Sequence, residues 1–239
     1  MGTYYNPRIV TDGLVLALDA GNAKSYPGSG TTWTDLSGKG YNGTLTDGPT
    51  FSSADGGSIV LDGVNDFVQI PYDSYWDSNV FGTATVFSIE CWYKPDVFRD
   101  WDTVVMKWNP ALGGWYSAPE GASIWSNLAG FQAVFASGVA SNPGGSNVIL
   151  SYSTATLKWY HLCFTGDGVN LRLYVDGIQR STGLVSSRTV AVTTSNNGPT
   201  FGRRQFMLGK LSNSRFYTRA LNESEIRQNF NATRGRYGI

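Results

Sequence analysis

The chain has 239 residues, of which 15% are charged and 14% are aromatic, and 18 lysines and arginines balance 18 aspartates and glutamates. A chain without net charge has no overall field that would draw it to nucleic acid or to an anionic membrane. No apolar run approaches the roughly 20 residues of a membrane-spanning helix. The polar start TYYNPR predicts that the chain is not secreted through a signal peptide.

Short apolar runs separated by turn residues predict one all-β domain. We expect strands at residues 14–19, 58–62, 67–71, 86–93, 131–136 and 147–152. The first dozen residues, MGTYYNPRIVTD, cannot form a packed element alone, so residues 1–12 are expected to be an N-terminal docking arm. Alternation is lost between residues 95 and 130, and again in 137–147. Loops of that length commonly carry function or are held by a partner.

The segment NLRLYVDGIQR carries the clearest strand signal. Leu171, Leu173 and Val175 occupy alternate positions and therefore share one face of a strand. Asp176 and Gly177 follow, and both tolerate the positive φ angles that a type I′ turn requires. We predict a β-hairpin with its turn at these two residues.

One short helix is predicted near the end of the chain, within LNESEIRQNFNA. Asn222 can cap its first turn, and Glu225 stands three residues later, as in a capping box. Ile226 and Phe230 are four residues apart and therefore share a helix face. Residues 233–239 follow as a C-terminal tail.

The chain has two cysteines and one histidine, which offers little for a disulfide framework or a zinc site. Cys91 lies in SIECWY and Cys163 in YHLCFTG, both strand-like contexts, so we predict buried free thiols. His161, in KWYHLCF, is predicted to be a structural strand residue.

Several stretches occur in an order that resembles a known superfamily. They are GLVLALDAGN, WTDLSGKGYNGTL, GSIVLDGVNDFVQIP, FSIECWYKP, WYHLCFTGDGVNLRLYVDG, FGRR and NSRFYTRALNESEIRQNFNATRGRYGI. Together they resemble the concanavalin A-like lectin/glucanase superfamily in its LamG-like branch, related to laminin G and the pentraxins. The resemblance covers about residues 13–232. It implies a jelly-roll sandwich of two antiparallel sheets with one short C-terminal helix.

The ends of the chain suggest a setting. The opening YNPRIVTDGLVLALDAGN and the closing RQNFNATRGRYGI resemble the ends of such domains in tailed-phage virion proteins. This resemblance implies a virion structural or decoration protein, made in the host cytoplasm and oligomeric in the particle. Its terminal arms would contact other capsid or tail proteins. The alternative is a receptor-binding module of a tail fibre that binds host-surface glycans.

Catalysis is not expected. Glucanase members of the superfamily place two carboxylates on alternate residues of one strand, so that they flank the glycosidic bond. The comparable strand here has Glu90, but the residues two and four positions later are Trp92 and Lys94. A glycoside hydrolase is therefore the least favoured function, and we predict a protein that is not an enzyme.

The stretch LDGVNDFVQIP leaves two interpretations open. In LamG-like and pentraxin relatives, carboxylates and amides near the corresponding position can bind calcium, and the resemblance carries this to Asp62, Asn65 and Asp66. Calcium takes about six to eight oxygen ligands, so Asp19 and Asn22 would be candidate helpers. The same residue types also suit a turn in which aspartate side chains accept backbone N–H groups, and the turn is the favoured interpretation.

The tryptophans also have two interpretations, because sugars stack on exposed rings while a sandwich core also needs aromatic residues. The candidate carbohydrate contacts are Trp76, Trp101, Trp108 and Trp115. Trp115, between glycines in LGGWYS, and Trp76, in DSYWDS, are the preferred ones.

Overall fold

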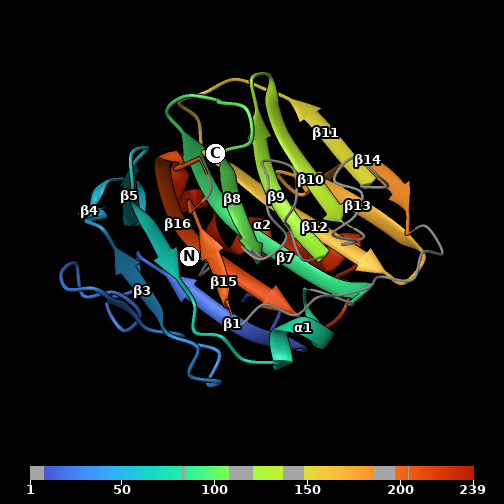
Figure 1. Cartoon of the computed structure of the whole chain (residues 1–239), viewed down its shortest axis with the longest axis horizontal. Helices are drawn as coiled ribbons and strands as arrows, with labels where there is room; N and C mark the ends of the chain where they lie inside the picture. The colour runs from blue at the N-terminus through green and yellow to red at the C-terminus, as the bar shows by residue number, and fades with distance from the viewer. Residues whose placement is uncertain (1–7, 82–83, 108–120, 137–147, 186–196, 204) are drawn as a thin grey trace, which may run out of the picture.

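The computed structural model describes residues 8–81, 84–107, 121–136, 148–185, 197–203 and 205–239. Within them, two antiparallel eight-stranded sheets pack face to face, as Figure 1 shows. The predicted jelly-roll sandwich is confirmed. The part of the chain that the structure describes holds no helix long and apolar enough to cross a membrane.

The first sheet contains the strands nearest to the C-terminal helix. In order across the sheet, they are β14 (Ile178–Leu184), β13 (Asn170–Val175), β12 (Tyr160–Asp167), β7 (Val86–Pro95), β16 (Leu208–Tyr217), β5 (Ser58–Asp62) and β4 (Thr50–Ser52), with β1 (Leu14–Asp19) also paired to β16.

The second sheet forms the opposite layer. Its strands are β11 (Val148–Ser153), β10 (Gly130–Ala136), β9 (Gly121–Asn127), β8 (Thr103–Lys107), β15 (Pro199–Phe201), β6 (Phe67–Gln69), β3 (Gly43–Thr46) and β2 (Thr32–Trp33). The helical segments are α1 (Tyr75–Asn79), α2 (Glu223–Thr233) and the short 3-10 turns η1 (Ala54–Gly56) and η3 (Arg234–Tyr237).

The expectation of one long loop over residues 95–130 is wrong in part. Strands β8 and β9 lie inside this segment and pair with each other. All five residues of β8 are buried, Lys107 among them, so its pattern resembles neither a half-exposed strand nor a loop.

Both local predictions near the end of the chain are confirmed. Asp176 and Gly177 have φ angles of 55° and 73° and join β13 to β14. Helix α2 begins after Asn222, whose side chain accepts the backbone N–H of Glu225, while the Glu225 carboxylate accepts the N–H of Asn222. Cys91 is also buried and free, as predicted, and so is Cys163.

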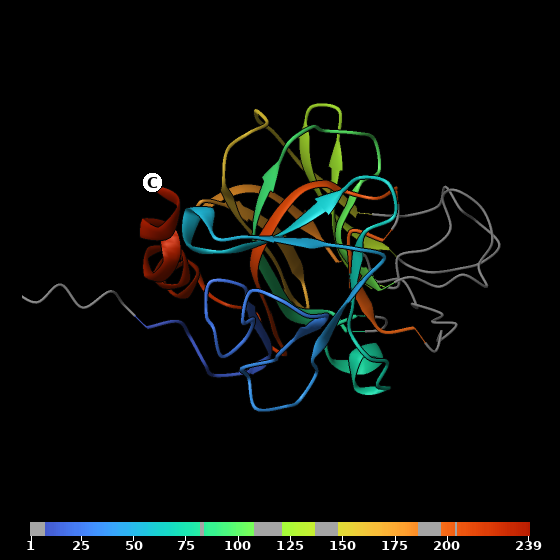
Figure 2. The same ribbon diagram turned by 90° about the vertical axis from the view of Figure 1, so that its left-hand side faces the viewer.

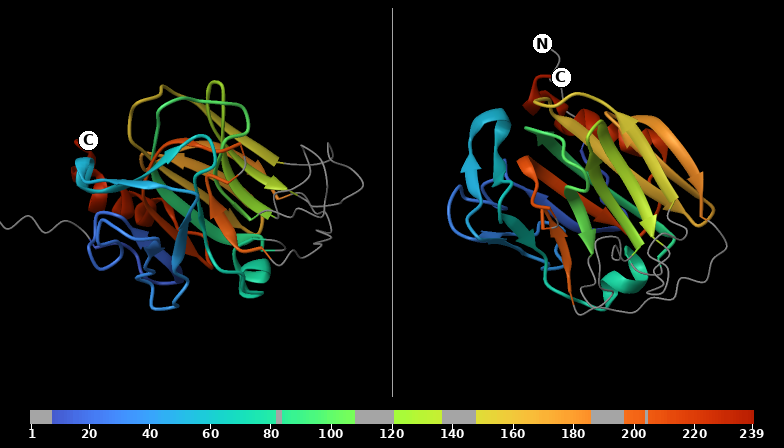
Figure 3. Two further views of the ribbon diagram at one scale, coloured as in Figure 1. Left: turned by 60° about the vertical axis from the view of Figure 1, so that its left-hand side comes forward. Right: turned by 45° about the horizontal axis from the view of Figure 1, so that its top comes forward.

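Alternate residues of the strands fill the space between the sheets. On β13, Leu171, Leu173 and Val175 are fully buried there, as their spacing predicts. On β12, the face that points away from this core is also buried, because α2 and η3 pack on the outer side of the first sheet. Figure 2 shows these two helical segments together on one side of the molecule, and Figure 3 shows α2 (red) beyond the first sheet.

The terminal segments pack on their own domain where the structure describes them. Tyr237 of the predicted tail is buried, and its ring stacks on Trp92 with ring centroids 4.1 Å apart. At the other end, the backbone N–H of Val10 donates to Asn229 Oδ1 at 2.7 Å. The tail at 233–239 is thus part of the fold rather than a free arm. Residues 1–7 of the predicted N-terminal arm lie outside the described residues.

Candidate functional site

The outer face of the first sheet is closed around a buried charged group, which we call the Glu90 cluster: Glu90, Arg215, His161 and Asn229. Arg215 Nη1 donates to Glu90 Oε1 at 2.6 Å, and Asn229 Nδ2 lies 3.1 and 3.0 Å from the two carboxylate oxygens. His161 Nε2 is 3.4 Å from Glu90 Oε2. Glu90 itself has no exposed surface. The cluster therefore joins the centre of the sheet to α2.

The charge of Glu90 is held by its neighbours. Burial alone would raise the pKa of the Glu90 carboxyl, but His161 and Arg215 lower it from 4.5 to about 2. A buried carboxylate that is ionised and bonded on both oxygens has no free oxygen to offer a substrate. In this arrangement Glu90 ties α2 to the sheet, which explains why a single acid appears on β7.

Trp76 does not present a ring to solvent, and its prediction as a sugar contact is wrong. Its side chain is completely buried, with its ring centroid 4.4 Å from that of Tyr41 and 5.9 Å from that of Phe216. The indole N–H donates to the carbonyl of Pro71 at 3.1 Å. Trp76 lies in the short helix α1, and the side of this helix that faces the core carries the indole. The polar residues beside Trp76 in the sequence belong largely to the other sides of the helix.

The other predicted tryptophans divide between two outcomes. Trp101 is half-buried, has a φ of 69°, and packs edge-on against Trp125 with centroids 5.2 Å apart. Trp125 is only 2% exposed. Trp108 and Trp115 lie outside the described residues. Of the two that the structure describes, Trp76 is buried and Trp101 is partly exposed.

The stretch at Asp62 forms the turn that we favoured. Asp62 Oδ1 accepts the backbone N–H groups of Val64, Asn65 and Asp66 at 2.8, 3.3 and 3.4 Å. These bonds, led by the one from Val64, lower the pKa of Asp62. Burial raises the pKa of Asp66, whose Oδ2 accepts the N–H of Asp62 at 3.1 Å. Each carboxylate thus has a structural role in the turn.

The helper ligands are also engaged elsewhere. Asp19 Oδ1 accepts from Arg236 at 2.6 Å, and Asn22 Oδ1 accepts the backbone N–H of Lys24 at 3.0 Å. Among the described residues, no group of three or more His, Cys, Asp and Glu side chains could hold a metal ion. The donor set here fits a turn better than it fits calcium.

The outer face of the second sheet carries the candidate binding surface. Thr44 on β3 pairs with Gln69 on β6, and Gln69 pairs with Thr200 on β15. Directly paired residues of antiparallel strands place their side chains on the same face. These three residues, which we call the polar row, therefore form a line of hydrogen-bonding groups across the sheet. Thr44 is exposed, Gln69 is half-buried and Thr200 is buried.

Arg203 organises one side of the polar row. Its Nη1 donates to Gln69 Oε1 at 2.9 Å, and its guanidinium lies 5.0 Å from the centroid of the Phe67 ring. Gln69 Nε2 in turn donates to the carbonyl of Ile70 at 2.7 Å. Arg203 and Phe67 are both half-buried. The amide is fixed at both ends, which keeps this part of the surface in one conformation.

Sequence reasoning missed the polar row. Alternation in FVQ would place Gln69 opposite the buried Val68, and this signal was available. The neighbours of Gln69 are Thr44 and Thr200, which are 25 and 131 residues away along the chain. Strand order across a sheet cannot be derived from one sequence, so the row becomes visible only in the folded chain.

The family is established by a direct match. The model of the concanavalin A-like lectin/glucanases superfamily (Laminin_G_3) matches residues 62–227, and the chain belongs to this family. No curated protein sequence matches the chain.

Solved structures agree on the fold. Domain 4 of AbnA, a GH43 extracellular arabinanase from Geobacillus stearothermophilus in complex with arabinotriose, has a TM-score of 0.62 at 18% identity, covering 90% of this chain and 97% of that one. The binding domain of botulinum neurotoxin DC in complex with rat synaptotagmin II has a TM-score of 0.69 at 16% identity, covering 94% and 52%. Botulinum neurotoxin type C, whose cell entry depends on two ganglioside molecules, has a TM-score of 0.68 at 14% identity, covering 94% and 52%. This chain thus spans about half of the length of the toxin structures.

Proposed function

We propose that this protein is a non-catalytic carbohydrate-binding module that presents the outer face of its second sheet to its ligand. The observation that carries the proposal is the difference between the two outer faces. Helix α2 and the tail close the first, whereas on the second Thr44 is exposed and Gln69 and Arg203 are half-buried. Hydrogen-bonding groups beside aromatic rings are what a sugar needs for orientation and contact.

The proposal that the protein is not catalytic rests on the position of Glu90. A retaining or inverting glycosidase needs two carboxyl groups that reach the sugar. Glu90 is buried under α2 and bonded to Arg215 and Asn229, so it cannot reach a substrate without displacing the helix. Incubation with oligosaccharides is expected to release no product, and turnover that is lost in Glu90→Gln would contradict the proposal.

Relatives of the same fold support a binding role. The arabinanase domain is in complex with arabinotriose, and the neurotoxin type C chain interacts with gangliosides. Another neurotoxin binding domain is in complex with a protein, rat synaptotagmin II, so a protein ligand on the same fold is the competing outcome.

A glycan array tests the proposal directly. The protein is expected to bind a restricted set of glycans, and Gln69→Ala should weaken that binding because it removes the centre of the polar row. Gln179→Ala is the matched control, because Gln179 is an exposed glutamine on β14 of the first sheet. Equal binding by both variants, or no glycan bound by the folded protein, would contradict the proposal.

The same glycan array, repeated with and without calcium, tests for a bound cation. The family resemblance predicts it at Asp62, Asn65 and Asp66, although the carboxylates of Asp62 and Asp66 accept hydrogen bonds within the turn. Binding that is lost in EDTA and restored by calcium would support a cation beside the ligand, and Asp62→Asn should then abolish the restoration.

We further propose that the module acts in the virion of a tailed phage, as a capsid structural or decoration protein. Support comes from the resemblance of both chain ends to those of virion proteins. A receptor-binding module of a tail fibre is the alternative within this setting, and it is favoured if the array identifies a host-surface glycan. Mass analysis of purified virions should find the protein, and failure to find it would argue strongly against this setting.

A further inference from the structure

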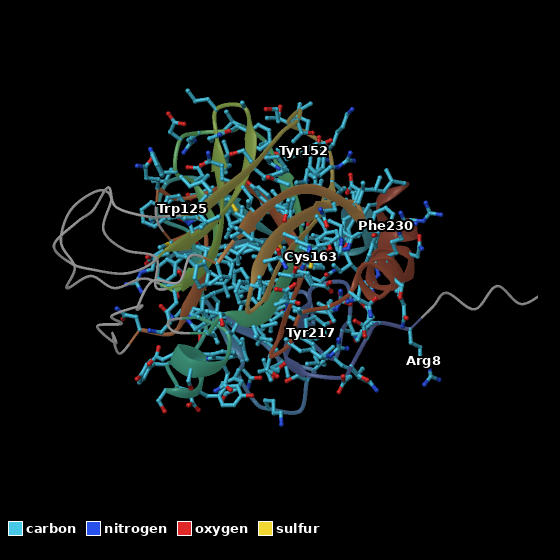
Figure 4. All side chains as sticks on the ribbon, turned by 90° about the vertical axis from the view of Figure 1, so that its right-hand side faces the viewer. Arg8, Trp125, Tyr152, Cys163, Tyr217 and Phe230 are labelled. Atoms are coloured by element: carbon cyan, nitrogen blue, oxygen red, sulfur yellow. The ribbon has the colours of Figure 1, made fainter. Side chains whose placement is uncertain are left out.

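A cleft lies away from the polar row, between the C-terminal helical segments and the connection from β11 to β12. Its volume is about 590 Å³. Its walls come from η1, β7, the β11–β12 connection, α2 and η3. We call it the tail cleft. Figure 4 places Phe230, which lines the tail cleft, and Trp125 of the second sheet on opposite sides of the molecule.

Aromatic rings form one wall of the tail cleft, and the fold holds them rigidly. Phe230, Trp159 and Tyr237 all line it. Trp92 lies behind them, stacked on Tyr237 at 4.1 Å and on Phe230 at 5.6 Å between centroids. Trp159 packs on Tyr237 at 4.8 Å. A ligand would therefore meet a preformed apolar surface, which reduces the entropy lost on binding.

One polar atom in this wall has no partner. Only 6% of Trp159 is exposed. Its indole Nε1 is buried and makes no hydrogen bond within the described part of the chain. A buried donor without an acceptor is costly, so such groups normally have a partner.

Two exposed basic side chains at the tail cleft are available to a ligand. Lys94 and Asp55 face each other at 3.8 Å and offset each other. Lys158 and Arg234 are both exposed, and neither forms an ion pair with any described residue; Arg234 lies 5.7 Å from the Phe230 ring centroid. Asp176 and Ile239 also line the cleft, and Asp176 already accepts the backbone N–H of His161 at 2.9 Å.

We propose that the tail cleft binds a short acidic saccharide. One face of a sugar ring lies against the aromatic wall, and its carboxylate or sulfate group pairs with Lys158 and Arg234. Asp176 accepts from a hydroxyl group. The volume suits a ligand of two or three sugar units, since small-molecule sites span roughly 300–1,000 Å³. This site is independent of the polar row and does not require that the polar row bind a glycan.

The test uses the full chain and three probes: trigalacturonic acid, a heparin-derived tetrasaccharide and the uncharged trisaccharide maltotriose. Calorimetry measures affinity, and NMR follows the Trp159 indole N–H, assigned with Trp159→Phe. We expect one acidic probe to bind, to shift this resonance, and to weaken as salt is added. The carboxylated and sulfated probes distinguish the two sources of negative charge.

Variants make the result specific. Lys158→Ala combined with Arg234→Ala is expected to weaken binding of the acidic probe by roughly tenfold or more, because both charged partners are lost. Arg227→Ala is the matched control, since Arg227 is an exposed arginine of α2 that pairs with Glu223. Gln69→Ala should leave this affinity unchanged, which separates the tail cleft from the polar row.

Three results would overturn the proposal. The first is an affinity for maltotriose equal to that for the acidic probes. The second is full affinity in the folded double variant. The third is that neither acidic probe binds at millimolar concentration. A thermal melt of each variant shows that it is folded. Lys158 and Arg234 are exposed, so little change in stability is expected.

Discussion

Replacement of Glu90 by glutamine should destabilise the protein by about 3 kcal/mol at pH 7. Glu90 is fully buried and bonded to Arg215 and Asn229, and removing one partner of a buried ion pair costs about 3–5 kcal/mol. Linkage supplies a second estimate. Lowering the pKa from 4.5 to about 2 corresponds to about 3 kcal/mol, at 1.36 kcal/mol per pKa unit. Glutamine keeps the shape of the side chain, so the lower end of the range is expected.

The pH dependence identifies the cause. Because the pKa of Glu90 is lower in the folded state, its contribution to stability is complete above about pH 4.5 and is lost as the pH falls towards 2. The free energies of unfolding of wild type and Glu90→Gln, measured with guanidinium, should therefore differ by about 3 kcal/mol at pH 7. The difference should shrink steadily between pH 4.5 and pH 2.

The control is Glu223→Gln, at a glutamate whose pair with Arg227 is exposed on both sides. Exposed pairs contribute little, so this variant should lie within about 0.5 kcal/mol of wild type. A free energy of unfolding for Glu90→Gln within that same margin at pH 7 would refute the reasoning. A large difference that did not change with pH would assign the loss to packing instead of charge.

Three further predictions concern buried and turn residues. Burial raises the pKa of Asp102 to about 7, so the free energy of unfolding of the wild type should fall as the pH rises from about 4 to 7. In Asp102→Asn this pH dependence should disappear. Urea unfolding at pH 8 should show the variant to be more stable than wild type by on the order of 2–4 kcal/mol. Trp76→Ala should cost about 3–5 kcal/mol because it leaves a cavity in the core, and a loss below 1 kcal/mol would contradict its burial. Asp62→Ala, measured in EDTA, should lower the urea midpoint of unfolding because three backbone N–H groups lose their acceptor. An unchanged midpoint would show that the turn does not need this carboxylate.

The candidate sites could be predicted only in small part. Asp62 was recognised as a turn residue because its partners are two to four residues away. Trp76 was misplaced because the polar residues beside it suggested exposure, whereas helix α1 turns the indole inwards. The aromatic wall of the tail cleft combines Trp159 with Tyr237, and nothing in either local sequence shows that the two rings touch.

The sequence by itself determined the local structure. The hairpin at Asp176-Gly177 and the cap of α2 at Asn222 depend on residues within a few positions of one another, and short apolar runs between turn residues marked strands such as β1 and β7. Only the tertiary structure decided which segments cover the outer face of the first sheet. Glu90 finds its partners 125 and 139 residues away, and these contacts close the first sheet with a helix. The reason is that such contacts depend on the order of strands across each sheet, which hydrophobic burial of the whole chain selects and no short stretch encodes.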